Sequence, residues 1–196
     1  MSVEAALDSL RGGRPVLTVA SNGEGAVVLA AHEVQPHWVA WTIRHTSGLL
    51  CAPMPAARAD ELGLPPMVPR NQELSDIRYT VSVDARSGVT TGISAVDRAL
   101  TFRMLSAPDT TPGDLIRPGH VLPVCTRPGG VTERLAAEEA AVDLCTQAGL
   151  PPVAVLATLV SDRGDVLPLP GIRELAARHG LPVLDINELV AHTVPA

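Results

Sequence analysis

The stretch Tyr79-Thr-Val-Ser-Val-Asp-Ala-Arg-Ser-Gly-Val-Thr-Thr-Gly-Ile-Ser-Ala-Val-Asp-Arg98 indicates how the chain folds. Its first part, Tyr79 to Asp84, alternates β-branched and small residues, a pattern typical of a half-buried strand. A loop rich in glycine and hydroxyl groups begins at Gly88. Ser94 is placed to cap the helix that follows the loop. The stretch therefore predicts a strand, a loop and a helix in succession.

The same loop is a candidate anion site. Thr90 and Thr91 offer hydroxyl donors, and Gly92 lets a ligand approach the backbone closely. The N-terminus of the following helix, where Asp97 lies, favours negative charge on a ligand. Many such joints bind nothing, so the loop alone assigns no function.

The composition limits the possible partners. The chain has 196 residues, of which 46% are hydrophobic and 2% aromatic, so it can bury an aliphatic core. All 15 basic residues are arginines and the formal charge is −6, which argues against nucleic acid as a partner and excludes a lysine Schiff base.

The sequence also suggests a cytoplasmic protein. No apolar run approaches the roughly 18 residues of a membrane span, and the N-terminus lacks the pattern of a signal peptide. Cys51, Cys125 and Cys145 lie far apart without a Cys-x-x-Cys pair, so neither a disulfide framework nor a zinc site is implied.

The remaining segments predict a mixed architecture. The turn Arg127-Pro-Gly-Gly130 leads into a predicted helix from about Thr132 to Ala148, and Val153 to Val160 is the most strand-like run. Strands and helices do not alternate strictly. We therefore expect one α/β (α+β) domain over residues 1–196.

Seven segments follow one another in a specific order. They are Ile43-Arg-His-Thr-Ser-Gly48 with Cys51, Leu64-Pro-Pro-Met-Val68, Thr80-Val-Ser-Val-Asp84, Gly88 to Arg98, Arg117-Pro-Gly-His-Val121, Gly129-Gly-Val131 and Glu139-Ala-Ala-Val-Asp-Leu144. Together they resemble the 3,4-dihydroxy-2-butanone 4-phosphate synthase family, lyases of the riboflavin pathway. The resemblance implies a mixed sheet between helices and a homodimer with active sites at the subunit boundary. It also implies conversion of ribulose 5-phosphate to dihydroxybutanone phosphate and formate with Mg²⁺.

The chain departs from this family at the positions that carry metal ligands and acids. The family's acidic loop Arg-Glu-Asn-Glu-Gly-Asp corresponds to residues 21–26, where the metal-binding Glu falls on Asn22 and the closing Asp on Ala26. The metal-binding His falls on Ala137, and the Thr beside it on Glu138. The acid of the late strand falls on Thr158.

These departures predict a site without a divalent metal. Mg²⁺ binding depends on anionic oxygens, and neither alanine nor asparagine supplies one. Glu138, beside the lost histidine, is the alternative ligand. We therefore expect no cofactor, with Mg²⁺ as the alternative if the usual activity is kept.

Other family positions are retained. Arg134 corresponds to a phosphate-binding arginine and is expected to form an anion clamp beside Thr90 and Thr91. A purely structural arginine at a helix start would oppose the helix dipole, which favours the functional interpretation. The candidate catalytic residues are Glu24, His120 and Cys51, and the candidate substrate-binding residues are Arg134, Thr90, Thr91, Asp97, His45 and Glu138. For Glu24 a solvated loop carboxylate, for His120 a structural role and for Cys51 an inert buried thiol remain alternatives.

Three functions remain open. The first is a repurposed, metal-independent homodimeric enzyme that performs acid–base chemistry on a small anionic or carbonyl substrate. The second is the ordinary lyase reaction on ribulose 5-phosphate. The third is a non-catalytic protein that binds a phosphorylated ligand.

Overall fold

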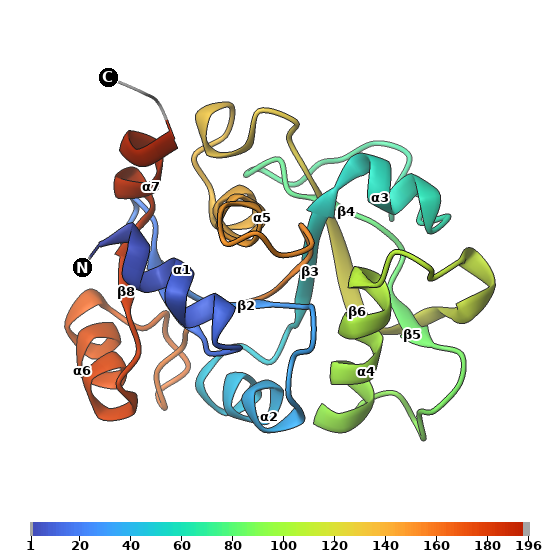
Figure 1. The fold of residues 1–196 in the computed structure, drawn as a ribbon, viewed down its shortest axis with the longest axis horizontal. Coiled ribbons are helices and arrows are strands. Elements are labelled where there is room, and N and C mark those ends of the chain that lie inside the picture. The colour runs from blue at the N-terminus through green and yellow to red at the C-terminus, as the bar shows by residue number, and fades with distance from the viewer. Residues whose placement is uncertain (1, 194–196) are drawn as a thin grey trace.

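An eight-stranded mixed sheet forms the centre of the computed structural model, which describes residues 2–193. Seven strands run in the order β4-β6-β3-β7-β2-β1-β8, and β5 pairs with β6 (Figure 1). The strands are β1 (Val16–Val19), β2 (Gly25–Ala30), β3 (Cys51–Pro55), β4 (Arg78–Tyr79), β5 (Val83–Ala85), β6 (Leu115–Thr126), β7 (Ala154–Thr158) and β8 (Val183–Asp185). Parallel pairs, such as β3 with β6, and antiparallel pairs, such as β2 with β7, occur in the same sheet.

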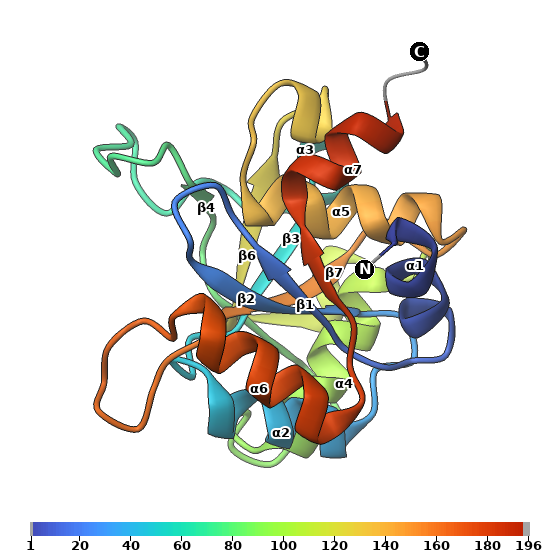
Figure 2. The same ribbon diagram turned by 90° about the vertical axis from the view of Figure 1, so that its left-hand side faces the viewer.

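Helices cover both faces of this sheet (Figure 2). They are α1 (Val3–Arg11), α2 (Pro36–His45), α3 (Ala56–Glu61), α4 (Ala95–Ser106), α5 (Ala137–Gln147), α6 (Leu169–His179) and α7 (Ile186–Thr193), with short 3₁₀ turns at Pro112–Asp114 and Gly130–Thr132. The predicted fold class, a mixed sheet between helices, is confirmed.

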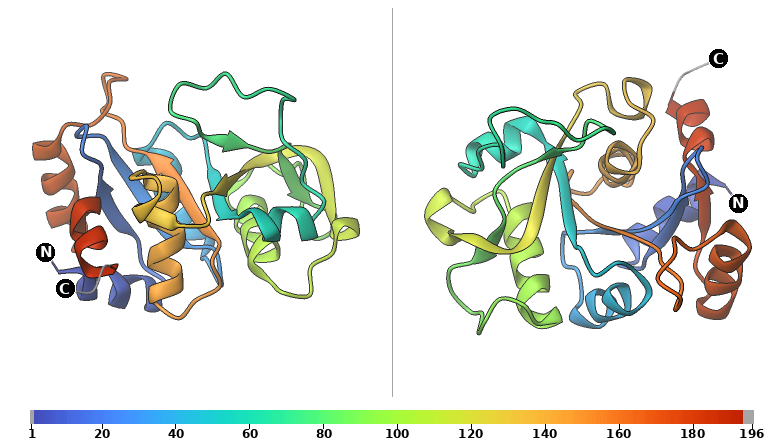
Figure 3. Two further views of the ribbon diagram at one scale, coloured as in Figure 1. Left: turned by 90° about the horizontal axis from the view of Figure 1, so that it is seen from above. Right: turned by 180° about the vertical axis from the view of Figure 1, so that it is seen from behind.

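Alternation along the strands divides the core into two clusters. Leu17, Val27 and Leu29 pack with α2, α4 and α6, whereas Val16 and Val28 pack with α1, α5 and α7. Because both faces are covered, β1 and β2 are buried throughout, and apart from Thr18 their residues are apolar. The helices α1 and α7, from opposite ends of the chain, lie side by side on one face (Figure 3).

The stretch from residue 79 to 98 folds as predicted in its second half only. Ser94 accepts a hydrogen bond from the backbone of Asp97 at 3.0 Å and caps α4. The predicted strand over Tyr79–Asp84 is instead divided into β4 and β5, both antiparallel to β6. The division arises because Val81 turns away to donate to the carbonyl of Pro65, and the pairing register shifts at Val83.

A second difference concerns the predicted helix from Thr132 to Ala148. A separate 3₁₀ turn over Gly130–Thr132 ends where the predicted helix starts, and α5 begins only at Ala137. Between them the chain takes an extended conformation at Ala136, which brings Arg134 back over the first turn of α5. Within residues 2–193, the helices are too short or too polar to cross a lipid bilayer.

Candidate active site

A cavity of about 520 Å³ lies where four segments meet. These segments are the β1–β2 connection, the loop before β4, the residues that lead into α5, and the end of β7. The lining residues are Ala20, Ser21, Asn22, Glu24, Gly25, Ala26, Ser75, Ile77, Arg134, Leu135, Ala136, Ala137, Glu138, Leu156 and Thr158. Three predicted site residues, Glu24, Arg134 and Glu138, therefore share one cavity.

The positions that depart from the family pattern line the same cavity. Asn22 and Ala26 of the segment 21–26, Ala137 at the start of α5 and Thr158 at the end of β7 all contribute to the wall. The two alanines carry no polar side-chain atom, and Thr158 offers a neutral hydroxyl. The cavity therefore contains few carboxylates; those in its lining are Glu24 and Glu138.

Asn22 is engaged by its own turn. Its side-chain oxygen accepts a hydrogen bond from the backbone N–H of Glu24 at 3.0 Å. The backbone of Ala20 in turn donates to the carbonyl of Glu24 at 2.8 Å, and Gly23 supplies the positive φ of 84°. The oxygen of Asn22 thus shapes the loop that presents the exposed Glu24.

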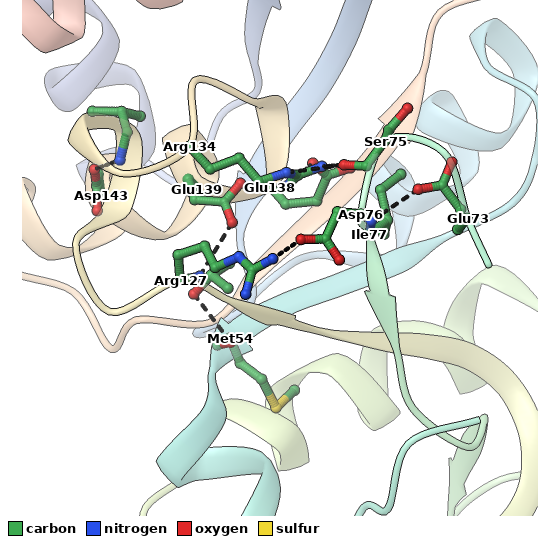
Figure 4. A network of polar contacts seen from close by, with 12 residues as sticks. Met54, Glu73, Ser75, Asp76, Ile77, Arg127, Arg134, Glu138, Glu139 and Asp143 are labelled. Carbon is green, nitrogen blue, oxygen red and sulfur yellow. Dashed lines mark hydrogen bonds and ion pairs between the residues drawn. The ribbon is translucent and has the colours of Figure 1, made fainter. Parts of the chain in front are cut away.

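Arg134 is held by two carboxylates and a carbonyl (Figure 4). Its Nη1 donates to Glu138 at 3.0 Å and to Glu139 at 2.5 Å. Its Nε and Nη2 donate to the carbonyl of Ser75 at 3.2 and 2.9 Å. A guanidinium has five N–H donors, so one remains for a ligand.

This arrangement corrects the reason for assigning Arg134 to an anion clamp. The arginine does not oppose the dipole of α5 without compensation, because Glu138 and Glu139 of the first turn neutralise it. Thr90 and Thr91 are not among the residues that line the cavity. Thr90 bonds Asp97, and Arg134 bonds Glu138, Glu139 and Ser75, so the clamp of Arg134 beside these threonines stays a prediction.

Glu139 links the cavity to the strand behind it. Its side chain is 1% exposed and accepts from the backbone N–H of Arg127 at 3.1 Å in addition to Arg134. Burial raises the pKa of this carboxyl, and Arg134 acts in the opposite direction. Arg127 also forms an ion pair with Asp76, which holds the loop before β4 against the cavity (Figure 4).

Cys51 lies at the start of β3, paired with Leu156 of the cavity wall. It is buried, and burial raises the pKa of its thiol from 9.0 to about 12, with the charge of Glu138 adding to the effect. Such a thiol stays protonated near neutral pH. Cys51 can donate a weak hydrogen bond, but it is not a base or a thiolate nucleophile.

His120 belongs to a second group, on β6. Its Nδ1 lies 2.7 Å from Oδ2 of Asp84, and its backbone N–H donates to Oδ1 of the same carboxylate at 2.9 Å. The side chain of His120 is 39% exposed and that of Asp84 10%. With Nδ1 held by Asp84, Nε2 is the ring nitrogen left for proton transfer. Asp84 was not among the predicted site residues; its signal was a carboxylate in an otherwise apolar strand.

The glycine and threonine loop packs directly against this pair. A side chain at Gly92, whose φ is 84°, would overlap with Asp84 and His120. Thr90 donates to Asp97 at 2.8 Å, and this bond lowers the pKa of Asp97. Thr90 and Asp97 therefore stabilise the turn, while Thr91 is exposed beside them.

His45 lies apart from both groups, at the end of α2. Its ring packs between Trp41 and His179, with ring centroids 4.6 and 5.6 Å away. Burial lowers its pKa, and the nearby His179 acts in the same direction. The structure therefore places the predicted site residues in three locations. Across residues 2–193, no cluster of three or more His, Cys, Asp or Glu side chains could hold a metal ion.

Comparison with known proteins gives the family. The family model of 3,4-dihydroxy-2-butanone 4-phosphate synthase matches residues 4–192. A riboflavin biosynthesis protein RibBA of Salinispora arenicola is 45% identical over 97% of this chain and 46% of its own length. A 3,4-dihydroxy-2-butanone 4-phosphate synthase of Sodalis glossinidius is 44% identical over 97% of this chain and 89% of its own length. The chain thus spans about half the length of the RibBA relatives.

A solved structure agrees over the whole fold. The crystal structure of a 3,4-dihydroxy-2-butanone 4-phosphate synthase in complex with two magnesium ions superposes with a TM-score of 0.94 and 37% identity, covering 98% of this chain and 96% of that one. The structural match and the sequence matches each extend over nearly the whole chain. The chain therefore belongs to the 3,4-dihydroxy-2-butanone 4-phosphate synthase family.

Proposed function

We propose that this chain is an enzyme that removes a proton beside the carbonyl group of a phosphorylated sugar, and that it converts ribulose 5-phosphate to dihydroxybutanone phosphate and formate. The observation that carries the proposal is the 44% identity to the synthase of Sodalis glossinidius, which extends over 97% of this chain. Riboflavin biosynthesis is the corresponding pathway.

The pair of His120 and Asp84 supplies the proton acceptor. Asp84 fixes the imidazole through Nδ1 at 2.7 Å and leaves the opposite nitrogen open to substrate. A positioned imidazole nitrogen is a common group for general acid–base catalysis. Glu24, on the exposed loop of the cavity, is the second candidate proton carrier.

A second copy of the chain would complete the site. The cavity lies beside the end of β7, and His120 lies on β6, outside the cavity lining. Ile93 on the loop before α4 and Val96 in the first turn of α4 are 52% and 60% exposed, and Leu49 is 54% exposed. Such neighbouring apolar side chains are typical of a surface that a partner covers. We therefore propose a homodimer with the site at its interface.

The residues of the cavity do not fit a pair of magnesium ions held by the protein alone. Glu24 and Glu138 are the two carboxylates in its lining, and Glu138 is paired with Arg134. Mg²⁺ prefers several anionic or water oxygens in octahedral geometry. The solved relative contains two magnesium ions, and the lining of this cavity offers few anionic oxygens for such a pair.

A second candidate function is favoured by the same lining. A metal-independent enzyme that acts on another small anionic or carbonyl substrate would need a cavity with few carboxylates. Asn22, Ala26, Ala137 and Thr158 provide such a wall. Specificity depends on the lining of a site rather than on its fold, so this candidate is compatible with family membership.

The release of formate distinguishes these possibilities. The protein is incubated with ribulose 5-phosphate, with and without Mg²⁺, beside a related synthase as positive control. Formate in amounts equal to the substrate consumed supports the lyase reaction. Consumption without formate supports the second candidate. An increase in melting temperature with the sugar phosphate but no consumption indicates a non-catalytic binding protein.

A further inference from the structure

We infer that the protein without substrate does not bind Mg²⁺ in the cavity, because Arg134 pairs with the carboxylates at the start of α5 and Glu24 is the one other acidic side chain in the wall. The inference concerns the free protein and does not depend on which candidate reaction it catalyses. It differs from what the fold neighbour with two magnesium ions suggests.

The first step is the set of available oxygens. The lining contains two carboxylates, those of Glu24 and Glu138, and no histidine or aspartate. The oxygen of Asn22 is bonded to the backbone of Glu24 at 3.0 Å. Thr158 contributes a neutral hydroxyl at most. A hard divalent cation would therefore find Glu24 as the one unpaired anionic side chain in the wall.

The second step is the state of Glu138. It bonds Nη1 of Arg134 at 3.0 Å, and the two side chains are 13% and 17% exposed. The same nitrogen bonds Glu139 at 2.5 Å, and the carbonyl of Ser75 holds the other edge of the guanidinium. A cation that used Glu138 would have to displace a mostly buried guanidinium that donates four hydrogen bonds, or bind beside its positive charge.

The third step is the cost of dehydration. Mg²⁺ gives up its water shell reluctantly and is usually held by protein carboxylates together with substrate phosphates. One exposed carboxylate on a loop does not compensate for this loss. A cation that entered with a phosphorylated substrate would rely on the oxygens of the substrate, which is a separate event from binding to the free protein.

The test uses Mn²⁺ as a paramagnetic probe, because it shares the preference of Mg²⁺ for oxygen ligands. The electron paramagnetic resonance signal of free Mn²⁺ is recorded with equal amounts of the full-length protein and no substrate. We expect the wild-type protein to leave the signal unchanged. The variant Asn22→Glu/Ala137→His, which adds two ligands to the wall, is expected to remove most of the signal, and Mg²⁺ is expected to raise its melting temperature.

A control variant, Ala57→His/Ala191→Glu, adds the same residue types at exposed positions outside the cavity and should leave the signal unchanged. Asn22→Glu/Thr158→Glu alters exposed positions only and replaces the first variant if that one folds poorly. Loss of the signal with wild-type protein, reversed by Glu24→Gln, would overturn the inference. So would failure of both folded site-building variants to bind Mn²⁺, because the missing ligands would then not be the reason. Formate release is measured separately, so neither result decides the reaction.

Discussion

At the scale of single residues, Arg134 determines the charge of the cavity. Sequence position alone suggests a free cation that awaits an anionic ligand. The structure shows a guanidinium engaged by Glu138, Glu139 and Ser75, with one N–H left over. Arg134 therefore has a structural role, and any role toward substrate rests on one remaining hydrogen bond and on its charge.

Replacement of Arg134 separates these roles. In Arg134→Ala, Glu139 stays buried without its charged partner and keeps the backbone N–H of Arg127, so we expect a loss of unfolding free energy on the order of 2 kcal/mol. The exposed pair of Arg11 and Asp8 is the matched control, and Arg11→Ala should cost less than about 1 kcal/mol. Urea unfolding gives both values. Calorimetry with ribulose 5-phosphate should show weaker binding to Arg134→Ala, and unchanged affinity would remove the arginine from the substrate site.

The thiol of Cys51 predicts a dependence of stability on alkaline pH. Its pKa is about 12 in the folded chain and 9.0 ordinarily. Above pH 9 the unfolded chain loses this proton and the folded chain keeps it, so the folded state binds more protons and stability falls as pH rises. The contribution approaches about 1.4 kcal/mol per pH unit.

Cys51→Ala should lower the stability at every pH. It should also make the decrease of unfolding free energy with pH less steep, by up to the contribution of one proton. Urea unfolding between pH 8 and 10.5 measures the slope. Cys145, with a pKa also raised to about 12 by burial, and Tyr79 contribute slopes of the same sign in both proteins. Identical slopes for the wild type and Cys51→Ala would contradict the assignment.

At the scale of elements, the loop before α4 fixes the pair of Asp84 and His120. Gly92 has a φ of 84° and lies where a side chain would overlap with both residues. The backbone N–H of Gly92 donates to Asp97 at 3.1 Å, which ties the loop to the first turn of α4. The loop is a support for the histidine as well as a candidate anion site.

Gly92→Ala should therefore displace the carboxylate that orients His120. Gly164→Ala is a matched control, because its φ of 89° imposes the same backbone strain and no atom lies within 4 Å of the added methyl. The control should lose about 1 kcal/mol of stability. Gly92→Ala should lose more, together with most of the catalytic turnover. Equal effects in unfolding and activity measurements would show that the overlap is relieved without consequence.

Elements could be predicted where local chemistry specifies them. The cap at Ser94 and the helix that follows it depend on neighbouring residues alone. The division of β4 from β5 depends on Pro65, and the late start of α5 accompanies pairing of Arg134 with Glu138 and Glu139. Contacts across the fold, or a turn stabilised by charge, leave no periodic signal in a sequence.

At the scale of the whole molecule, the candidate site residues come from several strands and loops: the cavity lies beside the end of β7, and His120 lies on β6. The family resemblance singles out Asn22, Ala26, Ala137 and Thr158 as departures from the pattern, and these four positions line one cavity. It does not show that Asp84 holds His120 across 36 residues, since one sequence does not reveal such pairs. The exposed apolar side chains of Leu49, Ile93 and Val96 are the main argument for a second subunit, and the single domain over residues 1–196 stays a prediction.

The proposed dimer predicts that charged residues introduced at its interface prevent the two subunits from associating. Ile93→Asp/Val96→Asp should convert a dimer to a monomer. The double variant replaces two exposed apolar side chains of the proposed interface with charged ones. Val166→Asp changes an apolar residue that is 45% exposed on a different turn and serves as the control. Light scattering coupled to size-exclusion chromatography gives the mass. A dimeric double variant, or a monomeric wild-type protein, would contradict the proposed interface.

The central claim is that this chain removes a proton beside the carbonyl group of ribulose 5-phosphate. Proton nuclear magnetic resonance of the substrate in D₂O, with wild-type protein and Mg²⁺ present, tests that claim most directly. We predict loss of the proton signals beside the carbonyl through exchange with deuterium, together with the growing resonance of formate. A substrate spectrum that remains unchanged in the presence of folded, dimeric protein would contradict the account.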